Sequence, residues 1–287
     1  MSNNNIDANK PKISIIGGGP NGLAMLADLK TNYSELFDTH LYEQGDIAHN
    51  ISQLPDTRWH SSMNELKLDN FLYSNNSIFL DDIQPEASEL ANFYRLSAME
   101  YSKYISTSYK LLNIEKIDRS NHSSYNLVFD NNKGFENIST DCLIMATGIT
   151  ESPLKINVAN YGNLNSYLDI SIKGKKILLI GSGSSSIDAI INLLPYNIIY
   201  WVRRSNLRKV FPTLKSDYNK ILNDFSSNLS IFDNSEVINY NLDSKSFVIT
   251  NNISIKVDHV IALCGYVSKS FLSEKLKLDH SNNFISY

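Results

Sequence analysis

The same pattern of strand, glycine-rich turn and helix occurs twice in this 287-residue chain. The apolar run Ile13–Ile16 leads into Gly17-Gly18-Gly19-Pro20-Asn21-Gly22, after which apolar residues recur at helical spacing. The run Lys175–Ile180 leads into Gly181-Ser182-Gly183-Ser184-Ser185-Ser186 and a second helical pattern. A strand, tight turn and helix begin a βαβ unit, in which two parallel strands flank the helix. The chain is therefore predicted to be an α/β protein.

Each half continues in the same way after its helix. A second strand is predicted at Thr39–Glu43 in the first half and at Asn197–Val202 in the second. Antiparallel strands with short turns then lead to a last apolar strand, at Leu143–Gly148 and at Val260–Gly265. The pattern predicts two Rossmann-like, doubly wound, three-layer nucleotide-binding units, each with a β-meander, the second unit inserted into the first.

The repeat also gives expected boundaries. They are residues 1–12 for a disordered tail, 13–150 plus 260–287 for the first unit, and 170–255 for the second unit. Residues 55–115 are expected to form a mostly helical insertion in the first unit. A capping-type sequence predicts that one helix of this insertion begins near Ser88.

The composition argues against several classes of function. Hydrophobic residues make up 42% of the chain and charged residues 20%, an ordinary balance for a globular protein. A formal charge of −4 without a sustained Lys/Arg block argues against a nucleic-acid partner. No apolar run reaches the roughly 18 residues of a membrane span, and the polar N-terminus lacks the features of a signal peptide. We therefore expect no membrane partner and a cytoplasmic location.

The chain has only two cysteines, Cys142 and Cys264, each in an apolar segment. We expect them to be buried in strands as small apolar residues, with a reactive thiol at Cys264 as the alternative. They form no CxxC pair or zinc pattern, and the six histidines do not cluster at ligand spacing. No metal site is therefore predicted.

The first glycine-rich turn has the features of an FAD site. Gly17, Gly19 and Gly22 form a GxGxxG turn between a predicted strand and a helix, where backbone N–H groups and the helix dipole favour a pyrophosphate. Glu43 ends the next strand, where a carboxylate accepts hydrogen bonds from the hydroxyls of an adenosine ribose.

The second turn differs at two positions. Ser186 replaces the third glycine after Gly181 and Gly183, and the next strand ends in Arg203-Arg204 instead of an acid. Guanidinium groups make planar, charge-assisted pairs with phosphate oxygens, so these arginines favour the 2′-phosphate of NADPH over NADH. The alternative is that both arginines are solvated charges at a strand end.

These motifs resemble the two-dinucleotide-binding-domain flavoproteins, which include thioredoxin reductases, bacillithiol disulfide reductase-like proteins and class B flavin monooxygenases. The resemblance covers nearly the whole chain. Ile13–Leu23 with Glu43 resembles the FAD site of the superfamily, and Ala146–Gly148 resembles its ATG crossover. Arg203–Arg208 is similar to the HRRxxxR segment of thioredoxin reductases, with Val202 in place of the histidine.

The motifs and this resemblance together predict the cofactor contacts. For the first unit and the flavin they are Gly17, Gly18, Gly19, Pro20, Asn21, Gly22, Glu43, Gln44, Trp59, Thr147 and Gly148. For the second unit they are Gly181, Gly183, Ser184, Ser185, Ser186, Arg203 and Arg204, and Gly265 follows the last strand.

Two segments resemble the monooxygenase branch. Gly181–Asp188 has the GxGxSxxD form, and Trp59–Lys67 resembles the aromatic-xx-L-xx-N-xx-K segment beside the flavin. The resemblance implies Asn64 as a catalytic residue, with an ordinary polar loop residue as the alternative. The linker fingerprint FxGxxxH of that branch is incomplete at Tyr161-Gly162, and the CxxC of thioredoxin reductases is absent.

Three functions remain open from the sequence. The first is an NAD(P)H-oxidising FAD monooxygenase that acts on a small molecule, and the second is a reductase without a dithiol. The third is an FAD- and NADP-binding subunit, because relatives continue beyond the equivalent of Leu276–Asp279 with a Gly-Asp segment that contacts FAD. In that case a second copy of the chain or a partner subunit completes the flavin site.

Overall fold

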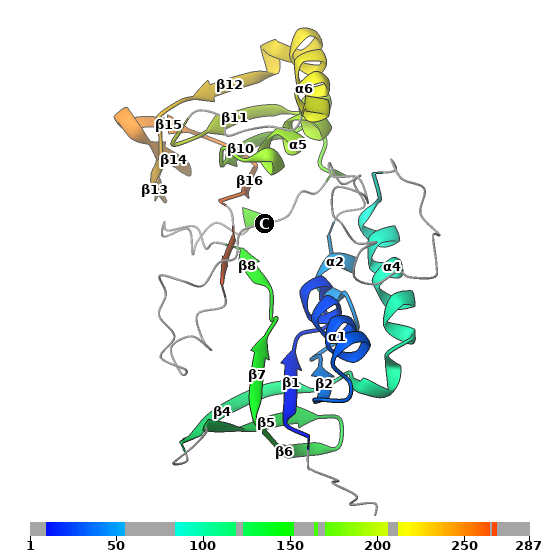
Figure 1. Cartoon of the computed structure of the whole chain (residues 1–287). Coiled ribbons are helices and arrows are strands. Elements are labelled where there is room, and N and C mark those ends of the chain that lie inside the picture. The colour runs from blue at the N-terminus through cyan, green and yellow to red at the C-terminus, as the bar shows by residue number, and fades with distance from the viewer. Residues whose placement is uncertain are drawn as a thin grey trace, which may run out of the picture. The chain divides into compact units, whose positions relative to one another are not determined.

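The computed structural model describes residues 10–54, 84–118, 123–151, 164–165, 170–205, 212–264 and 266–268. The chain divides into two compact units, which are described separately below (Figure 1). One unit contains residues up to Gly148, and the other is Ile149–Val267.

The first unit is built on a four-stranded parallel sheet with the order β3-β2-β1-β7. Its strands are β1 (Lys12–Ile16), β2 (Asp38–Tyr42), β3 (Ile105–Ser106) and β7 (Cys142–Met145). The strand β1 begins within the predicted N-terminal tail, at Lys12. Because β1 lies between β2 and β7, the strand order reverses beside it, which is where ligands bind in open α/β sheets.

Successive side chains of β1 point to opposite faces of the sheet, so they belong to two different hydrophobic cores. Ile13 and Ile15 pack against helices α1 (Pro20–Asn32) and α4 (Ala87–Met99). Ile16 instead packs with the antiparallel meander β4 (Lys110–Asp118), β5 (Ser123–Asn131) and β6 (Gly134–Thr140). Helices, parallel sheet and meander therefore form three layers. Two further short elements among the described residues of this unit are α2 (His49–Ser52) and the 3₁₀ turn Ser102–Tyr104.

The second unit repeats these layers on a sheet with the order β12-β11-β10-β16-β9. The strands are β12 (Leu229–Phe232), β11 (Ile198–Val202), β10 (Lys176–Ile180), β16 (His259–Ala262) and β9 (Leu164–Asn165). Ile177 and Leu179 pack against α5 (Ser184–Leu193) and α6 (Pro212–Phe225). Leu178 and Ile180 pack against the meander β13 (Val237–Asn241), β14 (Ser246–Ile249) and β15 (Ile253–Ile255).

The remaining elements are short. The strands β8 (Ile149–Glu151) and β17 (Tyr266–Ser268) form a separate two-stranded sheet. Three 3₁₀ turns of the second unit span Leu194–Tyr196, Ser226–Asn228 and Thr250–Asn252.

The predicted fold class is confirmed, since each unit has a parallel sheet with helices on one face and a β-meander on the other. The expected assignment to the first unit is wrong for residues 260–267, which belong to the second unit. The strand β16 pairs with β10 in the sheet of the second unit, because its apolar residues complete that core. The second unit therefore extends beyond the predicted limit at residue 255.

The predicted insertion is described only in part. Residues 84–115 contain α4 and the 3₁₀ turn Ser102–Tyr104 as well as β3 and the start of β4, and residues 55–83 lie outside the described residues, so a mostly helical insertion stays a prediction. The helix α4 begins at Ala87, close to the predicted start near Ser88, and its N-cap residue is Glu86. The side chain of Glu86 accepts a hydrogen bond from the backbone of Glu89, and the Glu89 side chain accepts one from the Glu86 N–H at 2.9 Å.

The two cysteines are less buried than predicted. Cys142 is exposed and Cys264 is of intermediate exposure. Cys142 is the first residue of β7, before the buried middle of the sheet begins, and Cys264 follows the end of β16.

Candidate functional site

The two glycine-rich turns have the same backbone hydrogen bonds. In the first unit, the Gly17 N–H donates to the Tyr42 carbonyl at 2.9 Å, and the Ala146 N–H donates to Ile16 at 2.8 Å. In the second unit, Gly181 donates to Val202 at 3.1 Å, and Leu263 donates to Ile180 at 2.7 Å. Each turn is therefore fixed between the ends of the two neighbouring strands, and the duplication extends to individual atoms.

The first glycine of each turn is required by its conformation. Gly17 has φ +117° and Gly181 has φ +137°, in a region that residues with a side chain rarely adopt. A Cβ atom on Gly17 would lie 2.2 Å from the Ala146 carbonyl oxygen, and one on Gly181 would lie 2.2 Å from that of Leu263. These glycines therefore allow close packing of the turn on the last strand.

The second glycine of each turn faces open space. Gly19 and Gly183 are the N-cap residues of α1 and α5, and no described atom lies within 4 Å of a Cβ built on either of them. A glycine has no side chain to cap the first N–H groups of its helix, so these donors remain available to an anion. Pro20 and Ser184 begin the two helices. Each turn therefore has an open cradle at its second glycine, Gly19 or Gly183, which a Cβ atom would partly fill. This cradle can accommodate a pyrophosphate.

The third position differs between the turns. A Cβ on Gly22 would lie 1.9 Å from the Gly17 carbonyl oxygen, whereas Ser186 in the second turn is tolerated and fully buried. Within the described residues, the Ser186 Oγ has no hydrogen-bond partner. A buried hydroxyl without a partner costs about 1–3 kcal/mol, so a polar ligand or a water molecule at this turn would be stabilising.

Glu43 follows β2 and is bound to the first turn. Its carboxylate accepts hydrogen bonds from the Gly18 N–H at 2.6 Å and from the Gly45 N–H at 2.9 Å. A carboxylate has about four acceptor sites, so these two bonds leave capacity for ribose hydroxyls. Gln44, the next residue, is exposed. The geometry orients Glu43 beside the cradle at Gly19.

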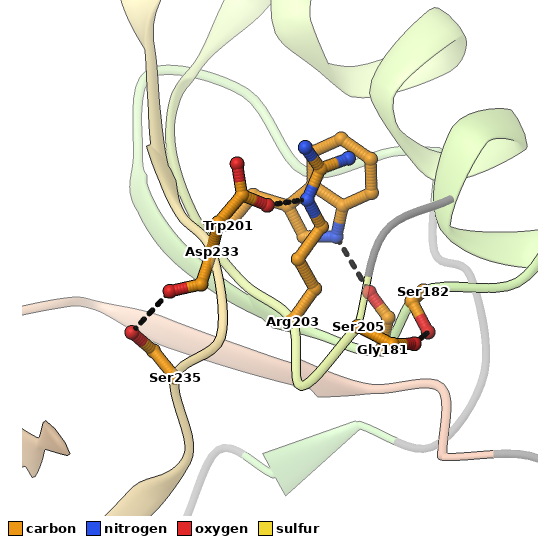
Figure 2. Close-up of polar contacts among 7 residues, drawn as sticks. All are labelled: Gly181, Ser182, Trp201, Arg203, Ser205, Asp233 and Ser235. Atoms are coloured by element: carbon orange, nitrogen blue, oxygen red, sulfur yellow. Dashed lines mark hydrogen bonds and ion pairs between the residues drawn. The ribbon is translucent and has the colours of Figure 1, made fainter.

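Arg203 and Arg204 follow β11 but have different surroundings, and Figure 2 shows those of Arg203. The Arg203 guanidinium pairs with the Asp233 carboxylate and lies over the Trp201 ring, 4.5 Å from its centroid. This guanidinium holds the pKa of the Asp233 carboxyl below its ordinary value, although desolvation opposes the shift. The Arg204 side chain is 73% exposed, and its Nε lies 3.9 Å from the Glu236 carboxylate.

The other predicted residues divide into two groups. Thr147 and Gly148 follow β7, Gly148 with φ +71°, and Asn21 and Ser185 are exposed in the first turns of α1 and α5. Trp59, Asn64 and Gly265 lie outside the described residues. The candidate catalytic role of Asn64 therefore stays a prediction.

Cys264 occupies the position in the second unit that Thr147 occupies in the first, one residue after the hydrogen bond to the central strand. Burial raises the pKa of its thiol, and the nearby positive charge of Arg204 partly opposes this shift. Among the described residues, no group of histidines, cysteines and acids has the arrangement to bind a metal ion. None of the helices in the described ranges combines the length and apolar character of a membrane span.

Sequence reasoning missed several contacts that support the turns. The Trp201 indole N–H donates to the Gly181 carbonyl at 2.6 Å, and Asp233 pairs with Arg203. Asp141 and Asp258 each accept a hydrogen bond at 2.8 Å from the backbone N–H of the first residue of a central strand, Lys12 and Lys176. The aspartates could have been found, because an Asp precedes the last parallel strand in both halves.

Comparisons with known proteins agree with this architecture. A family model described as pyridine nucleotide-disulphide oxidoreductase matches residues 14–287. The structure is similar to the bacillithiol disulfide reductase Bdr from Bacillus cereus, with a TM-score of 0.78 at 18% identity over 93% of this chain and 81% of that one.

Two further solved structures share the fold. The ornithine N-hydroxylase of Kutzneria sp. 744 has a TM-score of 0.69 at 13% identity, over 90% of this chain and 81% of that one. The thioredoxin reductase of T. acidophilum has a TM-score of 0.60 at 16% identity, over 91% of this chain and 79% of that one. No match was found among the curated proteins.

Proposed function

Because the chain belongs to the pyridine nucleotide-disulphide oxidoreductase family, we propose that it is an FAD-dependent enzyme that oxidises NADPH and transfers the electrons to a small molecule. The observation that carries this proposal is the pair of glycine cradles with opposite charges beside them. An acid, Glu43, follows the second strand of one unit, and two arginines follow the equivalent strand of the other.

The first unit is proposed to bind FAD. The N–H groups at the start of α1 would bind the pyrophosphate, and the open space at Gly19 would let it approach. Glu43 would accept hydrogen bonds from the adenosine ribose, since its carboxylate is already fixed by Gly18 and Gly45.

The second unit is proposed to bind NADPH in preference to NADH. The N–H groups at the start of α5 would bind the pyrophosphate, and the open space at Gly183 would let it approach. A carboxylate after β11 would repel a 2′-phosphate, whereas a guanidinium attracts it. When both cofactors are bound, the nicotinamide supplies a hydride and the flavin accepts it.

We further propose that the acceptor is a small molecule reached without a relay of two thiols. Only two cysteines are present, at positions 142 and 264, and they cannot form a CxxC pair. Monooxygenation is the favoured reaction, because Gly181–Asp188 has the GxGxSxxD form. Reduction of a disulfide or quinone is the second candidate, favoured by the similarity of Arg203–Arg208 to the thioredoxin reductase segment.

The test of the cofactor assignment is the absorption spectrum of the purified full chain loaded with FAD. Under anaerobic conditions, NADPH should bleach the flavin absorption, and NADH at the same concentration should do so more slowly. A protein that binds no FAD, or a flavin that neither nucleotide reduces, would contradict the proposal.

The two acceptor reactions differ in their use of oxygen. A monooxygenase should consume one O₂ for each NADPH when its organic substrate is present, and the product should gain one oxygen atom. A reductase should oxidise NADPH only with a disulfide or quinone, and this turnover should continue without O₂. An oxygen electrode combined with NADPH absorbance separates these outcomes.

A further inference from the structure

Arg203 has the same backbone position in the second unit as Glu43 in the first. The Glu43 N–H donates to Ser106 at 2.9 Å, and the Arg203 N–H donates to Phe232 at 3.1 Å. The carbonyl of Glu43 accepts from Tyr109 at 2.8 Å, and the carbonyl of Arg203 accepts from Ser235 at 3.0 Å. The two side chains can therefore be compared directly.

Their side chains behave differently. The Glu43 carboxylate reaches its own turn through the Gly18 N–H. The Arg203 side chain instead pairs with Asp233 and is only 12% exposed. Figure 2 shows its guanidinium lying over the Trp201 ring, with Asp233 beside its Nε. A 2′-phosphate would have to compete with the Asp233 carboxylate for this charge.

Trp201 connects Arg203 to the phosphate-binding turn. Its ring is fully buried, and its indole N–H donates to the Gly181 carbonyl at 2.6 Å. Tyr218 of α6 packs edge-on against the same ring, with centroids 6.3 Å apart. The guanidinium covers the ring at 4.5 Å, so Arg203 and Tyr218 together hold the indole that fixes Gly181.

Unlike Arg203, Arg204 makes none of the contacts that hold the Trp201 ring. Its side chain is 73% exposed, and its ionic contact is to Glu236, whose side chain is 64% exposed, at 3.9 Å. Exposed pairs of this kind contribute little to stability, so Arg204 can reorient toward a ligand. The next residue, Ser205, lies beside the turn, with its Oγ 3.4 Å from that of Ser182.

We propose that Arg203 is a positioning residue that acts through Trp201 on the Gly181 turn, and that the preference for NADPH depends on Arg204. This inference rests on the proposed function. The turn binds the pyrophosphate, which NADPH and NADH share. Loss of Arg203 should therefore weaken both nucleotides equally, whereas loss of Arg204 should weaken only the one with a 2′-phosphate.

Dissociation constants for NADP⁺ and NAD⁺, measured by calorimetry on the full chain, test this assignment without catalysis. Arg204→Ala should weaken NADP⁺ by about tenfold or more, the effect of one lost charged hydrogen bond, and leave NAD⁺ unchanged. Arg203→Ala should weaken both by the same factor, so that the ratio of the two constants stays at the wild-type value. Arg203→Lys should restore both, because an ammonium group can still pair with Asp233 over the indole.

Trp201→Phe is an independent variant, since it replaces the indole and its N–H by a smaller aromatic ring and leaves both arginines in the chain. It should weaken both nucleotides in parallel, as Arg203→Ala does. The inference is overturned if Arg203→Ala weakens NADP⁺ alone, or if Trp201→Phe leaves both constants unchanged. Failure of the wild-type chain to bind either nucleotide would contradict the proposed function itself.

Discussion

At the scale of single residues, the two units differ mainly in the charge that follows the second strand. Glu43 is held by the backbone N–H groups of Gly18 and Gly45, while Arg203 is held by a carboxylate and an indole. A carboxylate that accepts backbone N–H bonds stabilises the turn even before a ligand binds. Glu43, which is proposed to recognise the ribose of FAD, therefore also contributes to folding.

Glu43→Gln should reduce both stability and FAD affinity. An amide has one acceptor oxygen, so the N–H of Gly18 or Gly45 would face an NH₂ group instead of an acceptor. We expect a loss of about 1.5–3 kcal/mol in the free energy of unfolding, the range for one hydrogen bond to a charged group. Urea unfolding and FAD titration measure the two effects. Glu100→Gln is the matched control, because Glu100 is exposed at the end of α4 and belongs to no predicted cofactor contact, and it should change neither quantity.

The cysteines should differ in reactivity toward iodoacetamide. Cys142 is exposed, whereas burial raises the pKa of the half-buried Cys264 and so reduces its thiolate fraction. Mass spectrometry at near-neutral pH should find Cys142 modified first, and Cys142→Ser should remove the fast phase. Faster modification of Cys264 would mean that its thiol is more accessible and more acidic than this environment allows.

At the scale of elements, glycine-rich turns and alternating strands were the most predictable features. In residues 13–29 and 175–194, apolar residues recur first with the period of a strand and then with that of a helix. Each segment forms a strand followed by a helix, as this pattern predicts. The contacts of Trp201 with Gly181 and of Arg203 with Asp233 could not be predicted. They join residues of different elements, and the spacing of apolar residues within one element does not indicate which side chains of another element it will contact. The assignment of β16 failed for the same reason, because an apolar strand fits either sheet.

Two neighbouring glycines of the first turn should respond differently to substitution. Gly17→Ala places a Cβ 2.2 Å from the Ala146 carbonyl oxygen at a φ of +117°, so we expect a loss of about 3 kcal/mol or more in stability. Gly19→Ala has open space and should cost less than about 1 kcal/mol. Urea unfolding of both variants provides the comparison. Equal losses would contradict the geometry of the turn.

Tyr42, at the end of β2, should make the first unit sensitive to alkali. Burial, with a contribution from Glu136, raises the pKa of its hydroxyl from 10.0 to about 12. The folded protein keeps this proton where the unfolded chain releases it, so stability falls as pH rises from about 10 toward about 12, by about 1.4 kcal/mol per pH unit. Tyr42→Phe should show a smaller loss in urea unfolding between about pH 10 and about pH 11. An identical loss in both proteins would mean that other groups carry it.

At the scale of the whole molecule, two units with one plan are proposed to bind two different dinucleotides. Their turns share hydrogen bonds between equivalent atoms, so the difference in ligand must come from the side chains around them. This arrangement predicts that each site can be removed separately. Gly19 and Gly183 are suitable positions, because a Cβ at either one meets no described protein atom within 4 Å.

The most direct test is an anaerobic titration with NADPH of the wild-type chain and of Gly19→Val and Gly183→Val, followed by the flavin absorption. The Gly19→Val protein should lose FAD but still bind NADP⁺ in calorimetry. The Gly183→Val protein should keep FAD, remain reducible by dithionite, and fail to be reduced by NADPH. If Gly183→Val loses FAD, or if Gly19→Val keeps it and loses NADP⁺, the assignment of the two cofactors to the two units is wrong.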